Sequence, residues 1–212
     1  LYVDLARRLG LMQAQMAQGA IRKATLNYRG EVARRGTKLI TAAFVAGLLE
    51  NRLAEQVNIV NAQLLAQERG IDMIETSSPK KGDFSTLVQS EVVADSKPTT
   101  ISGTLFGNQY LRLVQIGPYR MDTYLDGTML IFPHRDVPGL VGHIGTIFGK
   151  HQVNIARMAL GRESPGGDAI AVLNLDSTPS PEALDEVKAH PSIHSLTIVN
   201  LPPAGAMPPW FG

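Results

Sequence analysis

The segment from His134 to Asn154, HRDVPGLVGHIGTIFGKHQVN, is the part of this chain best suited to bind a small charged ligand. A loop that leads into a helix presents unpaired backbone N–H groups, which together with the helix dipole favour a carboxylate. Asp136 and the side-chain carbonyl of Asn154 could receive an ammonium group, and His134 could bond a hydroxyl. These features fit a zwitterionic amino acid, and none resembles a nucleophile with its base. The alternative is that all three are ordinary turn and capping residues.

The composition excludes several other kinds of site. The chain contains no cysteine, which excludes disulfides, thiolate zinc sites, iron–sulfur clusters and a cysteine nucleophile. Lys and Arg number 20 against 19 Asp and Glu, and this balance argues against nucleic acid as the main partner. No two of the 20 glycines stand two positions apart, so the G-x-G of a dinucleotide-binding loop is missing.

No apolar run approaches the ~20 residues that span a bilayer, and the N-terminus lacks a signal-peptide core. We therefore expect a cytoplasmic protein with neither a membrane nor a nucleic acid as partner. Because the sequence does not begin with Met, we also expect it to be part of a longer chain.

Residues 1–125 predict helices followed by a mostly antiparallel sheet. An amphipathic helix is indicated over the first twenty residues, with Arg7, Arg8 and Gln15 off its apolar stripe. A strand at Ile21–Val32, a long helix after Gly36 and a short helix ending at Gly70 follow. Turn residues then separate five predicted strands, at Ile71–Thr76, Ser85–Val93, Thr99–Phe106, Tyr110–Ile116 and Tyr119–Leu125.

Residues 126–200 show a more regular pattern, and the Pro-rich residues 201–212 are typical of an irregular tail. Helices are predicted to begin at Pro138-Gly139 and at Ser180-Pro181. The predicted strands are Met129–His134, Val153–Ala159, Ala169–Leu175 and Ile193–Val199. Strand–helix–strand–strand–helix–strand is the ferredoxin-like βαββαβ order. The predicted fold class is therefore α+β, with an α+β domain (1–125), a ferredoxin-like domain (126–200) and a tail (201–212).

The ligand-binding segment resembles an ACT domain, whose signature is a strand, D/N-x-P-G, an apolar helix and VNI entering the next strand. Asp136, Pro138, Gly139 and Val153–Ile155 fill this pattern. Upstream, YRGEVA (28–33), SGTLFG (102–107) and RLVQI (112–116) resemble the intervening, allosteric-substrate-binding domain. Together the two modules are similar to the C-terminal regulatory half of long-form D-3-phosphoglycerate dehydrogenases.

This resemblance implies a role in serine biosynthesis. Enzymes of that family oxidise 3-phosphoglycerate with NAD in its first step, and L-serine, the end product, binds between two ACT domains that continue one sheet. By motif match, His134, Asp136 and Asn154 take the serine-contacting positions. The resemblance also implies feedback control and a homo-oligomer formed through both domains. Catalytic residues and the NAD site would lie outside this chain, which is expected to bind no cofactor and no metal.

A second ligand site is implied for the intervening domain, which in some relatives binds phosphate or the phosphorylated substrate through basic residues. Arg112 matches one of those positions, and Arg120 stands at a second polar one. Tyr124 and Asn174 depart from the pattern, because a relative can have arginine there. The alternative is that these arginines are ordinary solvated charges.

Two other functions stay open. The β-portion of an iron–sulfur L-serine dehydratase carries the same two modules, but this chain has no cysteine to ligate iron. A freestanding amino-acid-binding ACT regulator is the other. The gene sequence upstream of Leu1 would distinguish these functions. A G-x-G-x-x-G motif there supports the dehydrogenase, and an initiator Met supports the freestanding regulator.

Overall fold

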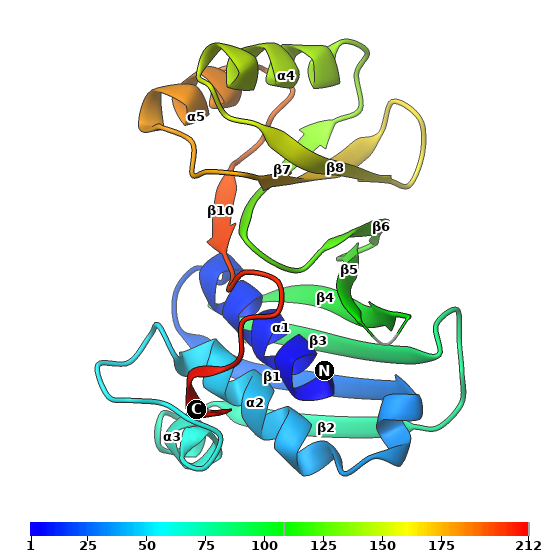
Figure 1. The fold of residues 1–212 in the computed structure, drawn as a ribbon, viewed down its shortest axis with the longest axis vertical. Helices are drawn as coiled ribbons and strands as arrows, with labels where there is room; N and C mark the ends of the chain where they lie inside the picture. Colours follow the sequence, from blue (N-terminus) through cyan, green and yellow to red (C-terminus); the bar gives the residue numbers. More distant parts are fainter. Residues whose placement is uncertain (108, 212) are drawn as a thin grey trace.

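Two β-sheets, one above the other in Figure 1, organise the chain, and the computed structural model describes residues 1–107 and 109–211. The first sheet has six strands in the order β2-β1-β3-β4-β5-β6. Only β1 and β2 run parallel, so the prediction of a mostly antiparallel sheet is confirmed. These strands are β1 (Ile21–Gly30), β2 (Asp72–Ser78), β3 (Thr86–Ala94), β4 (Lys97–Phe106), β5 (Tyr110–Ile116) and β6 (Tyr119–Tyr124).

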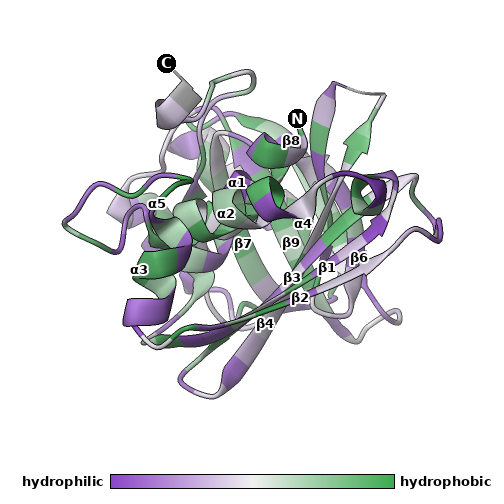
Figure 2. Ribbon diagram, turned by 90° about the horizontal axis from the view of Figure 1, so that it is seen from below, coloured by the Kyte–Doolittle hydropathy of each residue, from purple (hydrophilic) through white to green (hydrophobic). Residues whose placement is uncertain are grey.

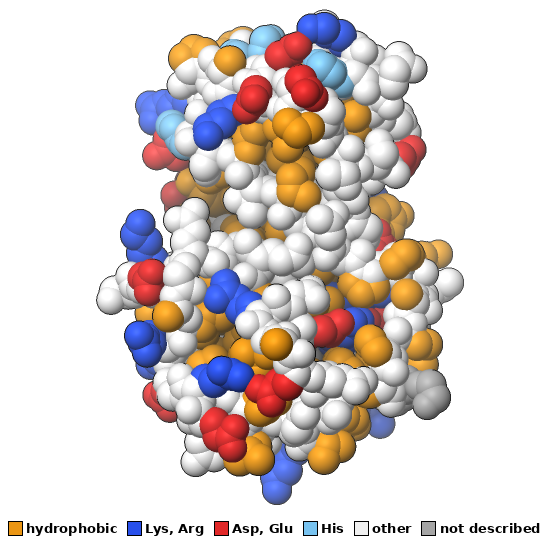
Figure 3. All heavy atoms as spheres, turned by 90° about the vertical axis from the view of Figure 1, so that its left-hand side faces the viewer, with side chains coloured by type: hydrophobic (Ala, Val, Ile, Leu, Met, Phe, Trp, Pro, Cys, Tyr) orange, Lys and Arg blue, Asp and Glu red, His pale blue; other side chains and the backbone are white. Residues whose placement is uncertain are grey.

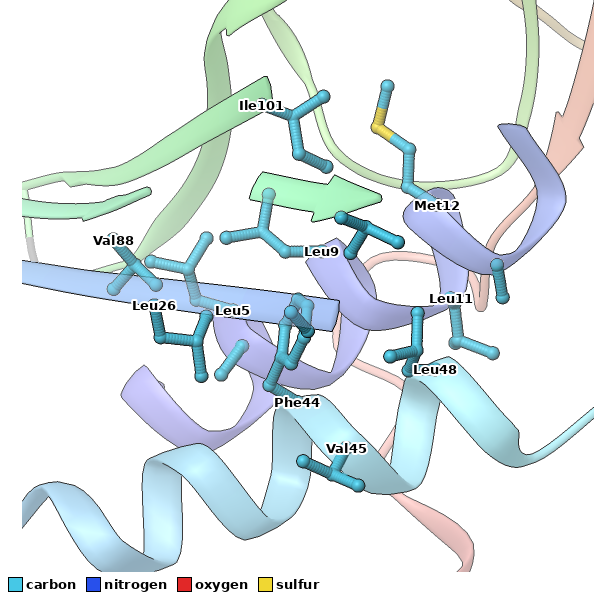
Figure 4. Packing of buried hydrophobic residues seen from close by; sticks show 14 of the residues in the cluster. Leu5, Leu9, Leu11, Met12, Leu26, Phe44, Val45, Leu48, Val88 and Ile101 are labelled. Atoms are coloured by element: carbon cyan, nitrogen blue, oxygen red, sulfur yellow. The ribbon is translucent and has the colours of Figure 1, made fainter. Parts of the chain in front are cut away.

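Helices α1 (Tyr2–Met16) and α2 (Thr37–Leu49) pack against this sheet, and α3 (Ala62–Glu68) precedes β2. A short 3-10 helix (Glu31–Arg34) follows β1, so the predicted strand ends two residues early. The apolar helix α2 lies beside α1 along one side of the strands (Figure 2). Leu5 and Leu9 of α1 meet Leu26 of β1 and Phe44 of α2 in the centre of this layer (Figure 4).

The two helices touch through backbone because each has a glycine at the crossing. A Cβ on Gly10 would lie 2.1 Å from the Phe44 carbonyl oxygen, and one on Gly47 would lie 2.1 Å from the Arg7 carbonyl oxygen. A glycine inside a helix normally lowers stability. The close approach of α1 and α2 explains why both positions lack a side chain.

The second sheet has four antiparallel strands in the order β10-β7-β9-β8, which is the ferredoxin-like arrangement. Its two helices cover the face that points away from the first domain (Figure 1). The elements are β7 (Thr128–Arg135), α4 (Leu140–Lys150), β8 (Ile155–Arg162), β9 (Asp168–Leu175), α5 (Pro181–Lys188) and β10 (Thr197–Asn200). The predicted α+β class is confirmed, including this domain's element order.

Local signals explain the helix starts, whereas the last strand is shorter than predicted. Ser180 caps α5 by accepting a 3.2 Å hydrogen bond from the N–H of Ala183, and Pro181 occupies the first helical position. The strand predicted from Ile193 begins only at Thr197. Ile193 makes a single isolated bridge with His134, after which the chain leaves the sheet for three residues.

The face of the second sheet without helices is buried against the first domain. Along β7, Leu130 and Phe132 belong to the core under α4 and α5, whereas Met129 and Ile131 belong to the core of the first domain. This alternation is the period of two that a strand buried on both faces requires. Within residues 1–107 and 109–211, no helix is long and apolar enough to cross a membrane.

Candidate functional site

The turn between β7 and α4 is the centre of the predicted ligand site. Gly139 occupies the N-cap position of α4 with a φ of +88°, a conformation that L side chains rarely adopt. No side chain caps α4 there. Leu140 and Ile144 are buried and anchor the helix. The first-turn N–H groups of α4 therefore have no side-chain cap and are suited to receive a carboxylate.

Asp136 is held in place by two hydrogen bonds to one of its oxygens. Its Oδ2 accepts from Nη1 of Arg162 at 2.7 Å and from the N–H of Gly166 at 3.1 Å. The hydrogen bond from Arg162, followed by that from Gly166, lowers the pKa of the Asp136 carboxyl below its usual value. Asp136 is therefore ionised near neutral pH, with Oδ1 turned to no hydrogen-bond donor among the described residues.

His134 is buried at the end of β7 and has one satisfied ring nitrogen. Its Nδ1 lies 2.9 Å from the carbonyl oxygen of Arg135. Because a carbonyl only accepts, Nδ1 carries the hydrogen in this contact, and in that tautomer Nε2 is an acceptor. Nε2 is buried without a partner in the described part of the chain. This atom is available for a donor such as a hydroxyl group.

Asn154 lies at the opposite end of the sheet. Its Nδ2 donates to Oδ2 of Asp176 over 2.6 Å. The next residue, Ile155, pairs with Leu175, which pairs in turn with Thr128 at the start of β7. Asp136 follows the other end of β7. One chain therefore brings His134 and Asp136 together but does not bring Asn154 to them.

The outer edge of β8 is open in this structure. Among the described strands β8 pairs with β9 alone, and its Leu160 is 48% exposed. Arg162, which binds Asp136, lies at the end of this strand, and Asn154 lies just before its start. The two halves of the predicted site are thus placed at the two ends of one free strand edge.

Arg112 is buried at the boundary between the two domains. Its guanidinium lies 4.0 Å from the ring centroid of Tyr124 and 5.3 Å from that of Phe106. The Asp122 carboxylate forms ion pairs with Arg112 at 3.6 Å and with Arg157 of β8 at 3.3 Å. Asp122 thus connects Arg112 of the first domain with Arg157 of the second, and Tyr124 stacks on Arg112 where a relative can have arginine.

Arg120 lies in a different environment, beside a surface cavity of about 300 Å³. Its side chain is 82% exposed and forms a 3.2 Å ion pair with Asp83. Arg29 of β1 lines the same cavity, together with apolar residues that include Phe84 and Met121. Arg112 and Arg120, predicted to share one anion site, thus have different ion-pair partners.

The sequence reasoning missed the role of Asn174, which is buried between the domains. Its oxygen accepts from the Thr123 hydroxyl, and its Nδ2 donates to the carbonyl oxygens of Tyr124 at 3.2 Å and Asp126 at 3.3 Å. The sequence indicated only that Asn174 stands where a relative can have arginine, and no neighbouring residue predicts its contacts across the domain boundary.

Charged side chains of both signs and histidines gather at the end of the molecule formed by α4 and α5 (Figure 3). Glu186 accepts hydrogen bonds from Lys150 at 2.6 Å and contacts His151 at 3.1 Å, and these contacts lower the pKa of its carboxyl. No group of three or more His, Asp or Glu residues in the described ranges could hold a metal ion.

The ferredoxin-like sheet, with its D-x-P-G turn into the first helix, defines an ACT-domain protein. The ACT domain family model matches residues 128–192. The model described as the D-3-phosphoglycerate dehydrogenase intervening domain matches residues 1–117, and the chain belongs to this family. Both resemblances noted in the sequence are confirmed.

Similar curated proteins carry the same name. The chain is 34% identical over 202 residues to the D-3-phosphoglycerate dehydrogenase of Archaeoglobus fulgidus, 32% to that of Methanocaldococcus jannaschii and 30% to that of Bacillus subtilis. The matches cover 94–95% of this chain but only 38% of each relative. The chain therefore corresponds to a non-catalytic part of these dehydrogenases.

Proposed function

We propose that this chain is the regulatory part of a cytoplasmic D-3-phosphoglycerate dehydrogenase, in which it binds L-serine and mediates feedback control of serine biosynthesis. The observation that carries the proposal is the match of both the intervening-domain and the ACT family models in one chain. NAD fits no part of this chain, because it lacks the glycine-rich loop that holds a pyrophosphate. In this proposal NAD and the catalytic residues belong to another part of the enzyme.

The position of Asn154 supports a site shared by two chains. If two β8 edges pair antiparallel about a two-fold axis, the start of each strand lies opposite the end of its partner. Asn154 of one copy then lies beside Arg162 and Asp136 of the other. The pairing also satisfies the N–H and C=O groups of an open edge. Two serine sites would form per pair of ACT domains.

Each group of L-serine has a partner in such a site. The carboxylate would meet the first-turn N–H groups of α4, and the ammonium group would meet Asp136 and the side-chain carbonyl of Asn154 from the other copy. Nε2 of His134, buried without a partner among the described residues, would accept from the serine hydroxyl. An amino acid without a side-chain donor would lack this hydrogen bond and should bind more weakly by about 0.5–1.5 kcal/mol.

Titration calorimetry of the chain with L-serine tests the proposal. We expect one L-serine bound per chain, weaker binding of L-alanine, and a dimer by sedimentation. L-Alanine binding as tightly as L-serine would contradict the role of His134. No heat with L-serine, together with a monomer at all concentrations, would contradict the proposed function. A freestanding regulator would bind serine in the same way, but its gene would begin near Leu1.

A second candidate site is favoured by the cavity between Arg29 and Arg120. Two arginines line this cavity, and although Asp83 lines it as well, a pair of guanidinium groups suits a phosphate-bearing anion. We expect inorganic phosphate to shift the NMR signals of residues lining this cavity. The Arg29→Gln/Arg120→Gln double variant should lose the shift, whereas Lys97→Gln, at an exposed hairpin, should keep it. Equal shifts in both variants would exclude the cavity as an anion site.

A further inference from the structure

Arg8 of α1 is almost completely buried and joins α1 to distant parts of the chain. It is 1% exposed, and its Nε donates to the Asp4 carboxylate over 2.8 Å. Its two remaining nitrogens donate to four backbone carbonyls. The carbonyls belong to Leu125 (3.2 Å), Pro202 (2.5 Å), Pro203 (2.9 Å) and Ala206 (3.5 Å).

These carbonyls lie where the chain crosses between the domains. Leu125 precedes the first strand of the ACT domain, and the other three residues follow its last strand. The two crossings also bond each other, since the N–H of Leu201 donates to Gly127 and the N–H of Gly127 donates to Pro202. Arg8 therefore holds both crossings against α1 at one point.

The other hydrogen bonds and ion pairs between the domains involve mainly β6, the strand that leads into the ACT domain. Thr123 and Asp122, which bond Asn174 and Arg157, both belong to β6. Helix α1 makes polar contacts with this region through Arg8 and through Gln15, whose amide exchanges two hydrogen bonds with the backbone of Asn200. Its buried apolar residues also share one core cluster with Met129, Ile131 and Val199 of the second sheet. Of Arg8 and Gln15, Arg8 is the buried charge, and a buried charge requires every one of its partners.

We propose that Arg8 is a positioning residue that couples α1 to the ACT domain, so that both open as one cooperative unit. Anything that changes the equilibrium constant for opening of the ACT domain then changes the equilibrium constant for opening of α1 by the same factor. The use of this coupling in feedback control rests on the proposed function, but the coupling itself does not.

Hydrogen exchange of the full chain tests the coupling without any ligand. Ile144→Val removes one buried methyl group from the ACT core and should speed exchange there about fivefold. If α1 opens with the ACT domain, its amides should speed up by the same factor. In an Arg8→Lys background, the ACT amides should respond as before and the α1 response should fall, because lysine has three donors at one point and cannot span both crossings.

Arg52 provides a matched control. Its guanidinium also donates to several backbone carbonyls, those of Ala14, Ala17 and Gly19, but all of them lie within the first domain. Arg52→Lys should lower the stability of α1 and leave its response to Ile144→Val intact. An equal α1 response in the Arg8→Lys and wild-type backgrounds would overturn the proposal, as would loss of the response in Arg52→Lys.

A second variant covers the case in which Arg8→Lys does not fold. A chain that ends at Leu201 keeps Arg8 but removes three of its four carbonyl acceptors, and its α1 response should fall below that of the wild type. An undiminished response would overturn the coupling.

Serine then separates the two proposals. At 100 times its dissociation constant, serine should slow exchange about 100-fold in the ACT domain and in α1 of the wild type, and in Arg8→Lys it should slow α1 less than the ACT domain. No slowing anywhere, with the Ile144→Val response intact, would contradict serine binding alone.

Discussion

The Thr123 hydroxyl donates a 2.5 Å hydrogen bond to the side-chain oxygen of Asn174, across the boundary of the two domains. Asn174→Leu keeps the branching of the side chain but leaves this hydroxyl and the carbonyls of Tyr124 and Asp126 without their partner. We expect a loss of about 3 kcal/mol in the free energy of unfolding, measured by urea denaturation. Thr123→Val should cost about 1 kcal/mol, and the double variant less than the sum. Additive losses would show that the two side chains do not interact.

The proposed sharing of one serine site by two chains predicts complementation between two variants that each fail to bind serine. Asp136→Ala and Asn154→Ala should each abolish serine binding while leaving the circular dichroism spectrum unchanged. In a mixed dimer, one site combines the intact Asp136 of one chain with the intact Asn154 of the other. We therefore expect calorimetry of the re-equilibrated mixture to recover binding, at one site per mixed dimer. A mixture that stays inactive would show that the two residues act in the same chain.

The contact between Arg162 and Asp136 predicts a dependence on acid. The pKa of Asp136 is lowered in the folded protein. The ionised carboxylate therefore stabilises the fold at every pH above 3.8, the usual pKa of this carboxyl. This contribution is lost as the pH falls through the lowered pKa. Arg162→Gln should raise the pKa of Asp136, measured by NMR titration of its carboxyl carbon. Arg135→Gln, which removes the partner of Asp168, should leave it unchanged.

The crossing of α1 and α2 predicts opposite effects for two helical glycines. Gly10→Ala places a methyl group on the Phe44 carbonyl and should cost about 3 kcal/mol in unfolding free energy. Gly142→Ala, in α4, meets nothing within 4 Å and should stabilise the chain by about 0.5–1 kcal/mol. Thermal unfolding of both variants measures the difference. A neutral Gly10→Ala would mean that the helices separate readily.

Local patterns predicted the parts of the site that depend on neighbouring residues. The D-x-P-G turn requires only a few consecutive positions, so the relation of Asp136 to α4 was visible in the sequence. The distance of Asn154 from that turn depends on strand pairing, which joins residues far apart in the chain. For this reason local sequence patterns could not show that Asn154 lies far from His134 and Asp136 within one chain.

The burial of arginines was equally hidden. Arg8 lies off the apolar stripe of α1, which indicates an exposed position, yet acceptors 117 to 198 residues away enclose it. Arg112 and Arg120 both occur in alternating strand patterns, yet Arg112 is buried beside Tyr124 and Phe106 whereas the Arg120 side chain is 82% exposed. The predicted domain limits at 125 and 200 remain predictions, although the two sheets divide between Tyr124 and Thr128.

The hydrogen bonds that join Gly127 to Leu201 and Pro202 bring the first and last residues of the ferredoxin-like unit side by side. A unit with adjacent ends can be exchanged for another of the same end spacing without rerouting the surrounding chain. A graft of an ACT domain that recognises a different amino acid would then change which metabolite is sensed and keep the framework beneath it.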